Sequence, residues 1–418
     1  MSQPKLSTPA AWFGSIALQQ RRMRFTGRRL LVLAFVLFAV LALVGLLTGS
    51  HELDSAGTIG AAITLAVPIG MAGLGGLWSE RAGVVNIGLE GMMILGTWGA
   101  GFAGSKWGPW QGLVLGVAMG ALGGLLHAVA TVTFGVDQII SGVAINLLGL
   151  GATQYLSALA FPNQPTQSNE IPSPPSITVP WVPDQMGTLQ AHHWFLVSDL
   201  ASVFRAVTYQ VSFFTVIAVL TLPLTGFVLW RTAFGLRLRS CGEAPYAAET
   251  LGVNVYRYKY VAVVVSGALA GFGGAYLATL SSIYREGQTG GEGFIGLAAM
   301  IFGNWRPGGL AAGATLFGYT DAVQLRSDTA VHAMLVLLAI FLAVFAVWSF
   351  VRRRPVQGVI SLVFGVLALV WYLKTVLLPQ QVPYMTPYIT TLLVLSLASQ
   401  RLRPPAADGL PYRRGEGQ

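Results

Sequence analysis

Two long apolar runs that meet at Glu80 and Arg81 constrain this chain more than any other feature of its sequence. The first extends from Gly57 to Trp78, and the second from Ala82 to Ala103. A helix of about 20 predominantly apolar residues crosses the hydrocarbon core of a membrane. We therefore predict two adjacent membrane spans, with the charged pair in a short turn at one membrane face.

The composition extends this interpretation to the whole chain. Hydrophobic residues make up 54% of the 418 positions, charged residues make up 10%, and the mean hydropathy is +0.64. These values exclude an ordinary soluble domain, which carries about 25% charged residues. We predict an all-α fold, a polytopic helix bundle in the plasma or inner membrane. The net charge of +9 is then expected in cytoplasmic loops, not on a nucleic-acid-binding surface.

Two polar residues inside the second apolar run are candidates for a gate or a pathway. Asn86 and Glu90 are four positions apart, so on a helix they would share one face. Glu90 would lie roughly 10 Å into the span at 1.5 Å per residue. An ionised carboxylate there costs on the order of 3 kcal/mol unless it faces protein or water. Two roles remain open for Glu90: a bond to a transported ligand, or a lock between helices near a gate.

A third candidate is Asn146, in the apolar run that follows Asp137. Gly142, Asn146 and Gly149 share a face of the predicted helix. The small glycines would let a neighbouring helix approach closely, with Asn146 bonded across the contact. A pore-lining role for Asn146 fits the same pattern equally well.

The chain divides into a basic N-terminal segment (1–29), a transmembrane domain (30–400) and a basic tail (401–418). We predict about 12 transmembrane helices, with both termini in the cytoplasm and the last span at 384–399. This topology obeys the positive-inside rule. It leaves five of the 25 Lys and Arg residues outside: Lys106, Arg205, Arg285, Arg326 and Lys374.

Two long segments between the predicted spans are expected on opposite sides of the membrane. Residues 161–210 are rich in proline and are expected as an external loop with little regular structure. Residues 231–259 are basic and are expected in the cytoplasm. There Pro245 can begin a short helix and Gly252 can end it, which predicts a helix over Pro245–Leu251. From spacing alone, this helix either binds a partner or lies at the membrane surface.

Three runs of the sequence resemble the permeases of ATP-binding-cassette (ABC) importers in the ribose and branched-chain amino-acid superfamily. They are "ERAGVVNIGLEGMM", "GLRLRSCGEAPYAAETLGVNV" and "GEGFIGLAAMIFGNWRPGGLAAGATLFGYTDA". The first is most similar to the branch that imports nucleosides with a basic-membrane-protein lipoprotein. The resemblance implies a permease domain in which the short cytoplasmic helix docks in a cleft of an ATPase subunit. The residues that it implicates in this coupling are Glu243, Pro245, Ala248, Glu249, Leu251 and Gly252.

The resemblance also implies a function and a set of partners. The chain would translocate a nucleoside or a simple sugar by alternating access, without covalent chemistry, cofactor or metal. Its partners would be an ABC ATPase, a second and non-identical permease subunit, an extracytoplasmic substrate-binding lipoprotein, and membrane lipids. Because the motif around Glu90 looks alike in branches with different substrates, a structural or gating role is favoured for Asn86 and Glu90.

Two rival functions remain. An ion-coupled secondary transporter would use Glu90 as its proton site, and a passive channel subunit would need neither ATP nor a binding protein. None of the four lysines follows a glycine, so the sequence holds no G-x-x-x-x-G-K-[ST] phosphate loop. If transport depends on ATP, we expect another chain to hydrolyse it.

One segment departs from the family pattern. The apolar runs Ala330–Val351 and Gln357–Tyr372, separated by three arginines, are predicted as an inserted helical hairpin (330–373). Because the insert is a pair of spans, removing it leaves a core of about ten without moving either terminus. We expect the hairpin to lie at the periphery of the bundle.

Overall fold

A computed structural model describes residues 27–192, 194–326, 328–375 and 402–415, together with positions 379, 385, 386, 389 and 392. The first half of the described chain contains these helices: α2 (Gly27–Thr48), α3 (Ala56–Arg81), α4 (Leu89–Trp107), α5 (Pro109–Ala128), which a π-helix continues over Val129–Thr133, and α6 (Gln138–Ala160). The second half contains α7 (Val182–Ala191), α8 (Val197–Thr208), α9 (Phe213–Arg231), α10 (Ala233–Glu243), α11 (Pro245–Thr250), α12 (Val255–Leu280), α13 (Glu292–Phe302), α14 (Pro307–Arg326), α15 (Asp328–Val351) and α16 (Pro355–Lys374). One short antiparallel strand pair joins β1 (Ser176–Ile177) to β2 (Val211–Ser212).

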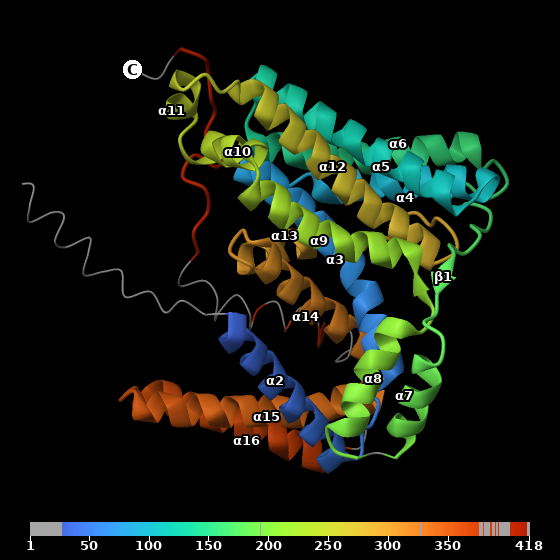
Figure 1. Cartoon of the computed structure of the whole chain (residues 1–418), viewed down its shortest axis with the longest axis vertical. Coiled ribbons are helices and arrows are strands. Elements are labelled where there is room, and N and C mark those ends of the chain that lie inside the picture. Colours follow the sequence, from blue (N-terminus) through green and yellow to red (C-terminus); the bar gives the residue numbers. More distant parts are fainter. Residues whose placement is uncertain are drawn as a thin grey trace, which may run out of the picture.

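Helix α12 is central to the larger part of the bundle, where it packs against α3, α4 and α5 (Figure 1). Small residues make this packing possible. A Cβ atom at Gly267 would lie 2.3 Å from the Gly120 carbonyl oxygen, and one at Gly271 would lie 2.5 Å from that of Gly116. Gly267 and Gly271 are four positions apart in the sequence, a small-xxx-small spacing that predicts a close helix contact, and the structure confirms that contact.

A second group of helices, α2, α15 and α16, lies along one side of the bundle (Figure 1). Helices α15 and α16 pack mainly on each other, and α15 also contacts α2 and α14. Many apolar side chains of α16 are exposed, including Phe364 at 60% and Leu373 at 70%. Exposed apolar residues of this density fit a lipid-facing surface.

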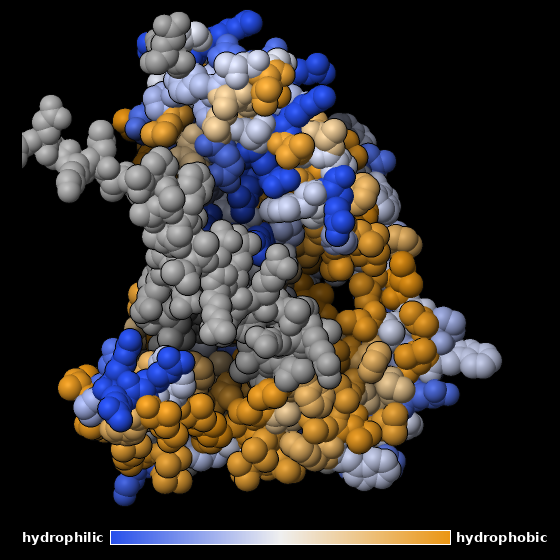
Figure 2. All heavy atoms as spheres, turned by 60° about the vertical axis from the view of Figure 1, so that its left-hand side comes forward, coloured by the Kyte–Doolittle hydropathy of each residue, from blue (hydrophilic) through white to orange (hydrophobic). Residues whose placement is uncertain are grey.

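Seven helices among the described residues are long and apolar enough to cross a membrane: Ala56–Arg81, Pro109–Thr133, Gln138–Ala160, Phe213–Arg231, Val255–Leu280, Ala330–Val351 and Pro355–Lys374. The predicted helical membrane bundle is therefore confirmed in outline. Hydrophobic surface covers the lower part of the molecule, where α15 and α16 lie, and hydrophilic residues gather at the upper end near α10 and α11 (Figure 2). The predicted last span (384–399) and nearly all of the N-terminal segment (1–29) lie outside the described residues.

The two ends of the bundle differ in what they carry. One end, here called the α10–α11 face, holds α10, α11 and the tail 402–415. The opposite end, here called the α7–α8 face, holds α7, α8 and the strand pair. In Figure 1 these faces lie toward the left and the right, respectively.

The expectation of little regular structure in 161–210 is wrong. Helices α7 and α8 and strand β1 all fall in this segment, and α8 packs on α3. Prolines suggested an open loop, but Pro183 stands in the first turn of α7, where a missing backbone N–H is harmless. Ala201 and Ser202 are buried on one face of α8, so its burial against the bundle stabilises the helix.

Candidate functional site

The polypeptide leaves helical geometry between α3 and α4. Helix α3 ends at Arg81 and α4 begins only at Leu89, so residues 82–88 form an irregular link. The predicted span that begins at Ala82 is wrong at this end, and Asn86 does not share a helix face with Glu90. The link and the first turn of α4 (82–91) are here called the junction.

Asn86 is fully buried in the junction, where its side chain bonds in two directions. Its Oδ1 accepts a hydrogen bond from the Gly88 N–H at 3.0 Å. Its Nδ2 donates to Ser266 Oγ of α12 at 2.8 Å. Ser266 lies near the middle of α12, so the junction reaches to about half the length of that membrane-spanning helix.

Asn146 holds the junction from α6. Its Oδ1 accepts from the Gly91 N–H at 2.7 Å, and its Nδ2 donates to the Ile87 carbonyl oxygen at 3.1 Å. The helices approach so closely here that a Cβ atom at Gly91 would lie 2.3 Å from the Ile145 carbonyl oxygen. The bonded helix contact that the sequence allows for Asn146 is therefore present, and the pore-lining role stays a prediction.

Glu90 connects α4 to the beginning of α13. Its side chain is buried, with 7% of the residue exposed. Oε1 accepts from Thr289 Oγ1 at 2.6 Å and from the Gly291 N–H at 3.0 Å, and Oε2 accepts from the Gly293 N–H at 2.8 Å. These N–H groups belong to the α13 N-terminus, where the helix dipole favours a negative charge. The partner that the depth of Glu90 demands is therefore a helix terminus within the protein.

Several residues that sequence reasoning missed also brace the junction. Lys259 Nζ donates to the Gly83 carbonyl oxygen at 3.0 Å, and Gln138 Oε1 accepts from the Val85 N–H at 2.6 Å. His127 contacts the Val85 carbonyl oxygen at 3.0 Å through Nε2. The sequence does mark two of these residues as candidates. His127 and Lys259 are ionisable and lie inside or beside apolar runs, where such residues are rare.

The side chains of Asn86, Glu90 and Asn146 thus bond mainly to backbone groups, and Asn86 and Glu90 also bond to the hydroxyl groups of Ser266 and Thr289. Irregular backbone at membrane depth must have its N–H and C=O groups satisfied by protein or water. Asn86, Glu90 and Asn146 satisfy part of that demand. Asn86 connects the junction to α12, Glu90 connects it to α13, and Asn146 connects it to α6. The arrangement joins four helices at one level and can transmit a shift of one helix to the others.

A second cluster lies at the α10–α11 face, around the last turn of α3. The Glu80 carboxylate accepts a hydrogen bond from Trp305 Nε1, and Arg81 Nη2 donates to the Trp305 carbonyl oxygen at 2.7 Å. Arg81 also pairs with Glu243 at 3.6 Å. The turn predicted at Glu80 and Arg81 is misplaced, because both residues belong to the last turn of α3 and the chain leaves the helix only at Ala82. The charges of both residues are enclosed by other segments.

Helix α11 confirms the predicted short helix to within one residue. Of the coupling candidates, Leu251 is 85% exposed, and Gly252 follows it with a φ of +82°. Pro245 and Ala248 face inward, and Ala248 packs in a cluster with Cys241 and Val255. Only part of the predicted set is thus available to another protein.

The two glutamates among the coupling candidates bind the C-terminal tail. Glu243 Oε2 accepts from the Ala406 N–H at 3.2 Å, and Glu249 pairs with Arg414 at 3.2 Å. The Ala407 N–H donates to the Gly242 carbonyl oxygen at 2.8 Å. The tail therefore lies across α10 and α11 as a strap, a contact that nothing in its polar sequence predicts.

Comparison with known proteins identifies the type of chain to which this architecture belongs. Residues 58–345 match the family model described as "branched-chain amino acid transport system / permease component". The guanosine ABC transporter permease protein NupQ of Bacillus subtilis is 34% identical over 85% of this chain and 96% of its own length. The nucleoside ABC transporter permease protein NupC of Lactococcus lactis is 32% identical over 82% and 93%, respectively.

A third relative has a different substrate in its name. The putative glucose ABC transporter permease protein TsgC13 of Haloferax volcanii is 33% identical over 86% of this chain and 98% of its own. No solved structure matches the chain. The family match covers more than half of the chain, and its end at residue 345 lies within α15. The chain therefore belongs to the family of permease components of the branched-chain amino-acid transport type, as a multi-pass protein of the plasma membrane.

Proposed function

We propose that this protein is the transmembrane subunit of an ABC importer and that it passes a nucleoside across the membrane. The proposed coupling to an ATPase is supported by α11, a short helix that the strap holds at the surface. Leu251, directly after this helix, is 85% exposed. The nucleoside part is supported by two relatives that carry guanosine or nucleoside in their names. A simple sugar is the second candidate, because TsgC13 is about equally similar.

The α10–α11 face is the cytoplasmic side in this proposal. Arg237, Arg239 and Arg257 belong to α10 and the beginning of α12, at that face. Basic residues in short loops are retained in the cytoplasm. The full topology, with about 12 spans and both termini inside, requires the predicted last span, which lies outside the described residues.

We assign a structural or gating role to the junction residues Asn86 and Glu90 and to Asn146, which holds the junction from α6. Their hydrogen-bond partners are backbone groups and the side chains of Met92, Ser266 and Thr289, all within this chain. A carboxylate bonded to a helix N-terminus is poorly placed to bind a transported molecule, since its acceptor atoms are already used. A change in the tilt of α13 would instead be felt directly by α4.

The partners follow from the same proposal. An ATPase subunit would bind α11, a second and non-identical permease would complete the path, and a lipoprotein would deliver the ligand. A ligand or ATP shifts the conformational equilibrium only by its different affinity for the two states. The hairpin 330–373 is assigned to the periphery, because α15 and α16 pack mainly on each other.

The test is uptake into right-side-out membrane vesicles that contain all the subunits and are loaded with ATP. We expect uptake of radiolabelled guanosine that requires the ATPase partner and the binding lipoprotein, and that glucose does not compete with. Competition by glucose and not by adenosine would select the sugar. Uptake that persists without the ATPase and follows a proton gradient would indicate a secondary transporter. Flux down the guanosine gradient that needs neither the ATPase nor a proton gradient would indicate a channel.

A further inference from the structure

The α7–α8 face contains a cavity that no part of the argument above uses. Its volume is about 860 Å³, and α3, α8, α9, α12 and strand β2 all contribute to its wall. Cavities of several hundred cubic ångströms are typical of small-molecule sites. It is here called the α8 cavity, after the helix that separates it from a smaller pocket.

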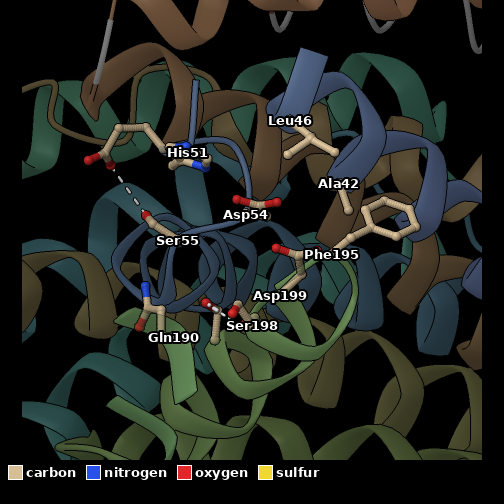
Figure 3. Close-up of a pocket in the computed structure, with 11 residues that line it drawn as sticks. Ala42, Leu46, His51, Asp54, Ser55, Gln190, Phe195, Ser198 and Asp199 are labelled. Carbon is tan, nitrogen blue, oxygen red and sulfur yellow. Dashed lines mark hydrogen bonds between the residues drawn. The ribbon is translucent and has the colours of Figure 1, made fainter. Parts of the chain in front are cut away.

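The smaller pocket differs in its charge. It has a volume of about 170 Å³, and Glu52, Asp54 and Asp199 all line it. Figure 3 shows Asp54 and Asp199 directed toward each other. Burial, and secondarily Asp199, raise the pKa of Asp54 to about 7. These carboxyl groups interact with one another, so this pocket offers no separate site.

The α8 cavity, in contrast, has no acidic residue among those that line it. Its one charged residue is Arg205, whose Nη1 donates to Gln190 Oε1 at 3.3 Å and whose guanidinium lies 5.9 Å from the centre of the Tyr209 ring. A cationic ligand would find no counter-ion there. A ligand with several phosphate charges would find only this one arginine, which already has partners.

The polar atoms of the cavity are neutral, and most are hydroxyl groups. Thr215 and Tyr276 share a hydrogen bond of 2.7 Å between their oxygens, and both are buried. Thr64 and Thr279 add two further hydroxyls from α3 and α12. Thr64 Oγ1 donates to the Gly60 carbonyl oxygen at 2.9 Å and Thr279 Oγ1 donates to the Tyr276 carbonyl oxygen at 2.8 Å, so both oxygens can still accept. This set suits a ligand that itself carries hydroxyl groups, which can donate to these oxygens.

Gln210 gives the cavity an additional, unused amide. Its backbone has a φ of +49°, which is uncommon for a residue other than glycine, and its N–H donates to Thr178 Oγ1 at 3.1 Å. Within the described part of the chain, no hydrogen bond occupies its side chain. The amide can both donate and accept, as the edge of a nucleobase requires, and the Tyr209 ring lies next to it in sequence.

We propose that the α8 cavity is the site where the permease first receives its ligand on the outer side, and that the ligand is a neutral nucleoside. The hydroxyl groups of Thr64, Thr215, Tyr276 and Thr279 would bind the sugar, and Gln210 with Tyr209 would bind the base. The inference rests on the proposed function and adds to it the place and the chemistry of recognition.

The experiment introduces one cysteine into the wall of the cavity. Ala61, on α3, is a small lining residue, and Thr188, on α7, is exposed and lines neither pocket. Ala61→Cys and Thr188→Cys are each assembled with all subunits in right-side-out vesicles. They are then treated with a bulky, membrane-impermeant methanethiosulfonate reagent, with or without guanosine.

We expect modification of Ala61→Cys to abolish guanosine uptake and guanosine to slow that modification at least severalfold, whereas Thr188→Cys is modified without either effect. Guanosine monophosphate and choline should give no protection. A second variant, Gln210→Ala, should raise the KM for guanosine about three- to tenfold, which corresponds to the loss of one hydrogen bond.

Failure of the inference and failure of the proposed function are distinguishable. If the unmodified wild type takes up guanosine but Ala61→Cys is modified without loss of uptake or without protection, the α8 cavity is not the site. An unchanged KM in Gln210→Ala would overturn the role of that residue in the same way. If the wild type takes up no nucleoside at all, the proposed function is wrong.

Discussion

Glu90 and Gly293 are in direct backbone-to-side-chain contact across two helices: the Gly293 N–H donates to Glu90 Oε2 at 2.8 Å. A Cβ atom at position 293 would lie 2.7 Å from the Glu90 Cα atom. The same contact therefore satisfies a buried carboxylate and requires a residue without a side chain opposite it. It makes the junction sensitive to changes at both positions.

Removal of the Glu90 carboxylate tests the junction as a lock. Glu90→Ala leaves Thr289 Oγ1 and the N–H groups of Gly291 and Gly293 without their acceptor, and each buried, unpaired group costs about 1–3 kcal/mol. Glu90→Gln retains one acceptor oxygen and the side-chain shape. We expect Ala to lower the thermal stability of the detergent-solubilised complex and to uncouple ATPase activity from uptake, and Gln to retain assembly and much of the transport.

The exposed residue Glu170 provides the control, since Glu170→Ala removes the same group from the surface. Stability, ATPase coupling and ligand affinity are measured on all three variants. If Glu90→Gln and Glu90→Ala both assemble normally but change ligand preference, Glu90 contacts the ligand and is not a lock.

Gly293→Ala tests the close approach of α13 to α4. The added methyl group meets backbone atoms of Glu90 at 2.7 Å, so one helix must move, at a cost of about 1–3 kcal/mol. Gly308→Ala is the matched control, because a Cβ atom there meets nothing within 4 Å. Thermal unfolding in detergent should separate the two. Equal stability would mean that α13 shifts freely, contrary to a rigid junction.

Leu251→Asp tests α11 as the contact with the ATPase. Leu251 is 85% exposed and packs on little in this chain, so we expect its replacement to leave thermal stability within about 0.5 kcal/mol of wild type. Co-purification of the ATPase and uptake should both be lost. Ala248→Arg, in contrast, places a long cation in the cluster around Cys241 and should disturb folding itself. Normal uptake by the Leu251→Asp variant would show that this part of α11 does not bind the ATPase.

Thiol labelling tests which face is cytoplasmic. Ala247→Cys stands at an exposed position of α11, and Thr188→Cys stands at an exposed position of α7. The native Cys241 should stay silent, because burial raises the pKa of its thiol to about 11 and the thiolate is the reactive form. In intact cells an impermeant maleimide should label Thr188→Cys and not Ala247→Cys. The reverse pattern would invert the topology.

The strap should be pH-dependent through Asp408. Burial raises the pKa of its carboxyl group from 3.8 to about 7, with Glu80 as a hydrogen-bond partner, and Lys259 and Arg81 oppose the shift. Below about pH 4 the free and the bound tail are both protonated, so binding is strongest there. As the pH rises to about 7, the free tail loses its proton while the bound tail resists, and binding weakens; above that value it stays constant.

Limited trypsin cleavage after Arg413 and Arg414 measures this effect, since Arg403 precedes a proline and is a poor site for trypsin. Between pH 5.5 and 7.5 we expect the wild-type tail to become about tenfold more susceptible, relative to Asp408→Asn at the same pH. The asparagine variant cannot ionise, so it corrects for the pH dependence of the protease. A constant ratio between the two proteins would show that Asp408 does not control the strap.

Sequence reasoning located most helices, because long apolar runs have few alternatives in a membrane. It also predicted the close contacts at Gly142, Gly149 and Gly271, since small residues on one helix face have a direct steric meaning. It placed the start of α4 wrongly, because residues 82–88 are as apolar as the helix that follows. Hydropathy does not distinguish a helix from an irregular segment that other helices brace.

The partners of the candidate residues were beyond prediction for a related reason. Ser266 lies 180 positions from Asn86, and Gly293 lies 203 positions from Glu90. Nothing local in the sequence pairs them. The strap was missed similarly, because a basic, proline-containing tail has the composition of a solvated end, and only the contacts of Ala407 and Arg414 reveal its place.

The strap has a consequence for the order in which the protein is made. Ala407 pairs with Gly242, which is synthesised much earlier. The α10–α11 face therefore cannot take its final form until residues 402–415 have left the ribosome. A partner that recognises the strapped face would bind only chains that have been extended past this segment, so shorter products would be left out of the transporter without a separate step of inspection.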